Sequence, residues 1–165
     1  MDNGRYHCPL GYSRVRDEET DNDVQISLLA DIQNGEIQNI EEILNETAHK
    51  KANHGEGTLY ASVLAGVNFE SAYFYAKKTQ EIGAIPYGPF VKDGTNCSRF
   101  VASTILHSIP SIITKLRLMF PCTIIPSPKR NVSICNRNYY VVDKIECRKI
   151  KRSIISGYFK SIERR

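Results

Sequence analysis

The segment 93–101 contains the residue with the clearest chemical potential, Cys97. Gly94 and Thr95 form a turn before it, and Asn96 can cap a helix that places Cys97 in its first turn. Unpaired backbone N–H groups and the positive end of the helix dipole favour a thiolate there, and the same N–H groups can receive an oxyanion. The pattern fits a catalytic nucleophile, and it also fits a buried, inert cysteine.

A thiol nucleophile needs a general base, and the four histidines differ in their access to Cys97. His107 lies ten residues further along the same helix, roughly 15 Å away, and is therefore excluded. His49 falls near the end of another helix, where a solvated or capping role is expected. His54, in a glycine-flanked loop, is our first candidate for the base, and His7 is the second.

Three further residues are candidates for substrate binding. Glu56 follows His54 by two positions and can line the same pocket, Asn96 adjoins the nucleophile, and Arg5 can bind an anionic group. Arg5 belongs to an N-terminal group of arginines, which can instead form ion pairs with nearby acidic residues: Arg5, Arg14 and Arg16 with Asp17, Glu18 and Asp21. We prefer the ion pairs.

The elements that must position these residues follow from hydrophobic periodicity and capping signals. We expect a helix over 40–51 that Asn39 caps, and a second over 69–82 between Asn68 and Gly83. Two further helices are expected, from 96 to about 106 and over 112–119. We expect strands over 24–28, 122–125 and 139–142, a turn at 34–35, and a basic amphipathic helix within 147–163. Phe69, Ala72, Tyr73 and Ala76 should form the buried stripe of the second helix. The fold class is α+β, with a small antiparallel sheet packed on helices.

Length and composition are typical of a single globular domain. The chain has 165 residues, of which 41% are hydrophobic and 24% charged, which excludes a disordered or collagen-like chain. No apolar run is long enough to span a bilayer, and the N-terminus lacks the features of a signal peptide, so we expect a cytoplasmic protein. Five cysteines without a C-x-x-C pair are expected to be reduced thiols, with no metal site and no cofactor. An oligomeric state is not indicated.

Charge is distributed unevenly. Residues 1–100 have nine Lys and Arg against fifteen Asp and Glu, whereas residues 101–165 have thirteen against three. The preferred interpretation is a basic surface that packs against the acidic half of the same domain. The alternative is salt-dependent binding of an acidic partner or nucleic acid.

Two groups of residues resemble a known fold. Tyr87, Gly88, Pro89 and Phe90, followed by the Asn96-Cys97-x-x-Phe100-Val101 pattern, resemble circularly permuted NlpC-like papain-fold proteins, the group related to lecithin–retinol acyltransferase. Further strings resemble a bacterial family of that fold: Gly4 to His7, Arg14 to Arg16, Thr20 to Asn22 and His54 to Gly57. The resemblance covers about residues 2–108. It implies one domain over 1–165, in which 1–108 is the papain-like region and 109–165 is a basic extension that completes the sheet.

The resemblance also implies a chemistry. Cys97 would attack an amide or ester of a small peptide or acyl substrate and form a thioester, as in a cysteine peptidase, amidase or acyltransferase. In this group a histidine on an earlier strand is the base, and we expect that Gly-His-Ala strand to lie ahead of Met1. Either His54 or His7 substitutes for it, or the chain is an inactive relative or an interaction module.

Overall fold

The computed structural model describes residues 1–53, 57–120, 127–143 and 146–153. This part of the chain is α+β, as predicted. Its helices are α1 (Ile40–His49), α2 (Phe69–Glu81), α3 (Cys97–His107), α4 (Ile112–Met119) and α5 (Pro128–Cys135). Two short 3-10 helices accompany them, η1 (Asn22–Val24) and η2 (Lys51–Asn53).

The strands form small antiparallel sheets. One sheet has the order β1-β2-β6, from β1 (Asp2–Gly4), β2 (Tyr12–Arg16) and β6 (Ile85–Pro86). The second has the order β5-β7-β8, from β5 (Leu59–Ala61), β7 (Tyr139–Val142) and β8 (Cys147–Ile150). A hairpin joins β3 (Ile32–Gln33) to β4 (Glu36–Ile37) through Asn34 and Gly35, both with positive φ, which confirms the predicted turn.

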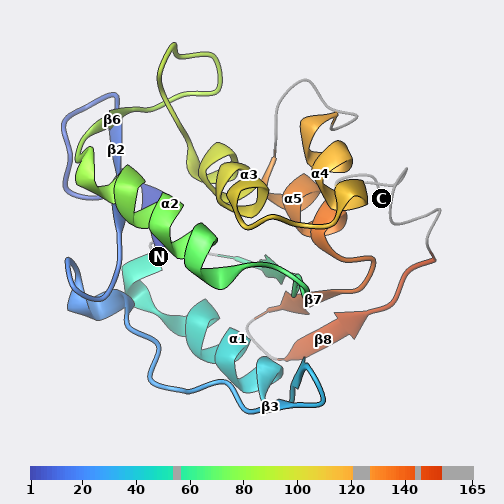
Figure 1. Ribbon diagram of the computed structural model, residues 1–165. Helices are drawn as coiled ribbons and strands as arrows, with labels where there is room; N and C mark the ends of the chain where they lie inside the picture. Colours follow the sequence, from blue (N-terminus) through green and yellow to red (C-terminus); the bar gives the residue numbers. More distant parts are fainter. Residues whose placement is uncertain (54–56, 121–126, 144–145, 154–165) are drawn as a thin grey trace.

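The helices enclose two small hydrophobic clusters. Figure 1 shows β7 between α1 on one side and α3 and α5 on the other. One cluster joins β2, α2 and α3 through Val15, Ala76 and Phe100. The other joins α3, α4 and α5 through Ala102, Leu118 and Ile134. Both clusters include α3, so the helix that begins at Cys97 is held from two sides.

The predicted asparagine caps of two helices are confirmed. The Asn68 side chain accepts a hydrogen bond from the Ser71 N–H at 2.8 Å, and α2 ends before Gly83, which has a φ of 77°. Asn96 accepts in the same way from the Arg99 N–H at 2.8 Å. Helix α3 therefore begins at Cys97.

Three local predictions in the N-terminal half are wrong. Residues 24–28 are not a strand, because no strand of the described segments pairs with them. The N–H groups of Ser27 and Leu28 donate instead to the Glu46 carboxylate at 2.7 and 3.1 Å. Asn39 does not cap α1 with its side chain, which bonds to the backbone of Leu29 and Asp31. In the expected stripe of α2 only Ala76 is buried, because the helix packs through its small residues and leaves Phe69 74% exposed.

The C-terminal part departs further from expectation. Strand β7 confirms the prediction for 139–142, and α4 confirms that for 112–119. Residues 147–150 form strand β8, paired with β7, rather than the start of a helix. Helix α5 was not predicted, although Ser127 caps it and Pro128 occupies its first turn. The strand expected at 122–125, and residues 154–163 of the expected final helix, lie outside the described residues.

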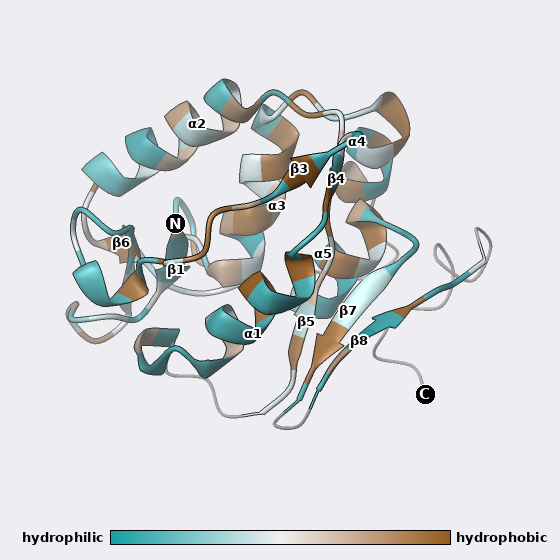
Figure 2. Ribbon diagram, turned by 90° about the horizontal axis from the view of Figure 1, so that it is seen from below, coloured by the Kyte–Doolittle hydropathy of each residue, from teal (hydrophilic) through white to brown (hydrophobic). Residues whose placement is uncertain are grey.

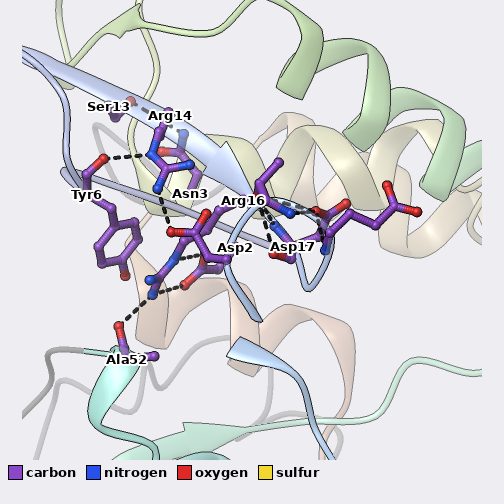
Figure 3. Close-up of polar contacts among 11 residues, drawn as sticks. Asp2, Asn3, Tyr6, Ser13, Arg14, Arg16, Asp17 and Ala52 are labelled. Carbon is purple, nitrogen blue, oxygen red and sulfur yellow. Dashed lines mark hydrogen bonds and ion pairs between the residues drawn. The ribbon is translucent and has the colours of Figure 1, made fainter. Parts of the chain in front are cut away.

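Two of the N-terminal arginines form structural ion pairs (Figure 3), and the pair between Arg14 and Asp21 is one of those expected. Arg16 pairs instead with Asp2, and Arg5 forms no ion pair with a described residue. Arg16 is 1% exposed and donates to both oxygens of Asp2 at 2.9 and 3.1 Å and to the Ala52 carbonyl at 2.6 Å. Its guanidinium also lies 3.4 Å from the centre of the Tyr6 ring. Arg14 pairs with Asp21 at 2.6 Å. These contacts tie β1, β2 and η2 together.

Candidate active site

Cys97 is the first residue of α3 and is exposed to solvent. The cap uses the Arg99 N–H, and the Phe100 N–H donates to the Asn96 carbonyl at 2.9 Å. The N–H groups of Cys97 and Ser98 are left without an acceptor within the helix. An exposed cysteine and two backbone N–H groups without an acceptor in the helix thus lie at one helix end.

The loop before α3 places Tyr87 next to this helix end. The Tyr87 N–H donates to the Gly11 carbonyl at 2.8 Å, and Tyr87 forms a parallel bridge with Thr95, whose N–H donates to the Pro86 carbonyl at 2.8 Å. Gly94 permits this closure, since a Cβ atom at that position would lie 2.7 Å from the Pro86 carbonyl oxygen. Strand β6 and the start of α3 are therefore held side by side.

Tyr87, Cys97 and Arg5 interact electrostatically. Burial raises the pKa of Tyr87 above its ordinary value, the negative charge of a Cys97 thiolate raises it further, and the positive charge of Arg5 opposes the shift. Arg5, a candidate for substrate binding, is exposed to solvent and lies near enough to affect Tyr87. Tyr87 belongs to the segment that resembles permuted NlpC-like proteins, but no local sequence pattern predicted that it lies near Cys97.

Cys97 also lines a groove of about 800 Å³ between β5, α3 and α5. The lining is largely apolar and includes Leu59, Tyr60, Val101, Ile105, Val132 and Cys135. Burial raises the pKa of the Cys135 thiol to about 11, in keeping with an apolar wall. The wall from α5 is joined to the start of α3, because the buried Asn131 side chain donates to the Ser98 carbonyl at 2.8 Å.

The described histidines are not hydrogen-bonded to Cys97. His107 lies at the far end of α3, stacked on Tyr75 with ring centres 3.9 Å apart. His49 contacts the Asn45 carbonyl at the end of α1, and His7 is exposed in the segment after β1. His54 and Glu56 lie outside the described residues.

The side chain of Asn96, the remaining candidate for substrate binding, has its oxygen engaged in the helix cap. Its amide NH₂ group adjoins Cys97 in the chain.

Several cations of the basic C-terminal part contact tyrosine rings. Lys129 lies 4.8 Å from the ring centre of Tyr60, and Arg152 lies 4.8 Å from that of Tyr139. Lys149 lies 5.6 Å from the ring centre of Tyr140. These cations pack on the β5-β7-β8 sheet.

The described residues contain no group of three or more His, Cys, Asp or Glu arranged to hold a metal ion. None of the helices in these segments is long and apolar enough to cross a membrane.

The fold and the site define a small α+β protein with an exposed cysteine at a helix N-terminus beside an apolar groove. Residues 1–112 match the family model described as type VI secretion system effector TseH-like. The chain therefore belongs to the TseH-like family of type VI secretion system effectors. Searches of the curated proteins and of the solved structures found no match. The matched segment includes Cys97 and ends within α4, so α5, β7 and β8 lie beyond it.

Proposed function

We propose that this protein is a papain-like cysteine hydrolase or acyltransferase that acts on an amide or ester through a thioester at Cys97. The observation that carries the proposal is the exposed Cys97 at the first position of α3, lining a groove large enough for a substrate. Membership of the TseH-like effector family supports it. The resemblance of residues 87–90 and 96–101 to permuted NlpC-like proteins also supports it.

In the first chemical step an imidazole takes the thiol proton and the Cys97 sulfur attacks the substrate carbonyl carbon. The N–H groups of Cys97 and Ser98 stabilise the negative charge that develops on the carbonyl oxygen. The bond to the leaving amine or alcohol breaks, and the imidazolium gives its proton to that group. Water, or a second alcohol or amine, then attacks the thioester and releases the free thiol. We assign the imidazole to His54, with His7 as the second candidate.

A second candidate function is an inactive relative that acts as an interaction module. The observation in its favour is that the titratable side chain whose pKa Cys97 shifts is the phenol of Tyr87, a poor base at neutral pH, and that this pKa is raised further. In such a protein the basic C-terminal half would bind an acidic partner.

We further propose that the protein is made in the cytoplasm and acts on a target outside the producing cell. The effector description of its family supports this proposal.

Steady-state hydrolysis of p-nitrophenyl acetate and of an N-acetyl-alanine p-nitroanilide tests these assignments. Cys97→Ser should abolish turnover, and His54→Ala should lower kcat at least about 100-fold, the usual contribution of a general base. His49→Ala is the matched control, because His49 bonds within its own helix, and it should retain the full rate. Turnover that survives Cys97→Ser would overturn the proposal. A wild-type protein without turnover would favour the interaction module, and full activity in both His54→Ala and His7→Ala would overturn the assignment of the base.

A further inference from the structure

Strand β5 is an edge strand whose second side has no strand partner among the described residues. It pairs antiparallel with β7 alone, with Leu59 opposite Val142 and Ala61 opposite Tyr140. In an antiparallel ladder alternate residues direct their N–H and C=O groups to opposite sides. At least one residue of β5 therefore directs both backbone groups away from β7.

The groove beside Cys97 borders β5 along its whole length. All three residues of the strand, Leu59, Tyr60 and Ala61, line it, together with Thr58 and Ser62 on either side. Cys97, Val101 and Ile105 line the same groove from α3. An extended chain that lies along β5 would therefore pass Cys97.

The two edges of this sheet differ in protection. The outer strand β8 carries the exposed cations Arg148 and Lys149, and its ribbon is mostly hydrophilic in Figure 2. Charged residues of this kind discourage pairing with another chain. Strand β5 has the sequence Leu-Tyr-Ala, without a charge. Exposed charges on β8 thus disfavour pairing with another strand, whereas β5 has no charged side chain that would disfavour it.

We propose that the free edge of β5 binds an extended peptide, which adds a fourth strand to the β5-β7-β8 sheet and places a peptide carbonyl at Cys97. This inference rests on the proposed function for the cleavage step and narrows the substrate from an amide or ester to a peptide amide. The peptide backbone bonds to β5, and its alternate side chains contact Val101, Ile105 and Val132. Small apolar side chains such as Val and Ala suit this lining.

An aliphatic acyl chain would use the same apolar wall without any backbone hydrogen bond. The two occupants are separated by alkylation of Cys97 with three chloromethyl ketones, in which the sulfur displaces chloride. The reagents are acetyl-Val-Ala-Val-Ala-chloromethyl ketone, its analogue with alternate amide nitrogens methylated, and an octyl chloromethyl ketone. Each rate is divided by the iodoacetamide rate, which reports thiol reactivity alone.

The unmodified peptide should react at least about tenfold faster than the methylated one, since methylation removes two edge hydrogen bonds. Equal normalised alkylation rates for the two peptides would overturn the inference. An octyl reagent that alkylates Cys97 as fast as the unmodified peptide would also overturn it, and would show that the groove binds an acyl chain.

Paired variants locate the binding. Val101→Glu places a charge on the groove wall at a side chain that is already 44% exposed, and should lower the normalised peptide rate about tenfold. Ile112→Glu is the matched control on α4, because Ile112 is 73% exposed and outside the groove lining. Equal rates in both variants would contradict binding in the groove.

Hydrogen exchange in Cys97→Ser gives a readout without chemistry. Addition of acetyl-Val-Ala-Val-Ala-amide should slow exchange of amides in residues 58–62 and leave β8 unchanged. Slower exchange in residues 58–62 without turnover of any substrate would support peptide binding at β5 and contradict the proposed hydrolase. Turnover by Cys97 without slower exchange, together with equal rates for the two peptide ketones, would contradict peptide binding at β5 and support the hydrolase.

Discussion

Tyr87 and Cys97 lie at the two ends of the loop that joins β6 to α3, close enough that Cys97 raises the pKa of the Tyr87 hydroxyl. The bridge between Tyr87 and Thr95 explains this proximity, because it brings the two ends of the loop together. The candidate site therefore includes a phenol near the sulfur.

Replacement of Tyr87 tests the contact. Tyr87→Phe should slow iodoacetamide labelling of Cys97 near pH 7 by about tenfold, because the thiolate loses a donor, while the free energy of unfolding changes by less than about 1 kcal/mol. The rate is measured by peptide mapping. Tyr12→Phe, at a 40% exposed residue of the neighbouring strand β2, is the control and should leave the rate unchanged. Unchanged labelling in Tyr87→Phe would show that the hydroxyl does not act on the thiol.

The described cysteines should differ in reactivity. Cys97 is exposed, whereas burial raises the pKa of Cys135 to about 11 and also raises that of Cys147. Because the thiolate is the reactive form, iodoacetamide near pH 7 should label Cys97 at least about tenfold faster than either. Mass spectrometry of the tryptic peptides gives the three rates. Equal labelling of Cys97 and Cys135 would contradict an activated, accessible Cys97.

The two asparagine caps provide a matched pair of variants. Asn96→Ala and Asn68→Ala each remove a 2.8 Å side-chain hydrogen bond, and each should lower the free energy of unfolding by about 1 kcal/mol in urea titrations. Only Asn96→Ala should also slow labelling of Cys97, since only that cap orients the first turn of α3. If Asn68→Ala slowed labelling equally, the effect would come from lost stability.

Acid should destabilise the protein through Asp17. Burial alone would raise its pKa, but the Lys77 ammonium at 2.6 Å and the Thr20 N–H lower it well below the unfolded value of 3.8. A depressed pKa in the folded state contributes stability above pH ~4, which is lost as pH falls toward the folded pKa. Between pH 4 and 2 the free energy of unfolding should fall by about 1 to 2 kcal/mol more in the wild type than in Asp17→Asn.

The control for the acid experiment is Asp23→Asn, at an exposed residue of η1. This variant should follow the wild-type curve. An Asp17→Asn protein with the wild-type slope would show that the Lys77 ion pair does not contribute to acid sensitivity.

Local signals in the sequence predicted local structure well. Asn68 and Asn96 cap their helices because a side-chain oxygen reaches an N–H three residues later, which requires no distant partner. Residues 24–28 and 147–150 were assigned wrongly because a strand depends on its neighbour. The first segment has no partner strand in the part of the chain that the structure describes, and the second pairs with β7.

The same distinction holds for the site. The position of Cys97 at a helix start was predictable, since Asn96 alone sets it. Its contact with Tyr87 depends on a loop closure, and its groove depends on α5, which packs from more than thirty residues away. Ser127 and Pro128 are a usable signal for α5, but nothing in their spacing indicates that the helix borders Cys97.

The most direct test is to locate the acyl group during turnover. Wild-type protein is mixed with p-nitrophenyl acetate, quenched in acid before steady state, digested and analysed by mass spectrometry. We expect an acetyl thioester on Cys97 that forms early and decays when the substrate is exhausted, while each protein molecule releases more than one molecule of product. Cys97→Ser should show neither the thioester nor turnover. Turnover with no acetyl group on Cys97, or a single acetylation of Cys97 that never decays, would contradict a thioester mechanism at this residue.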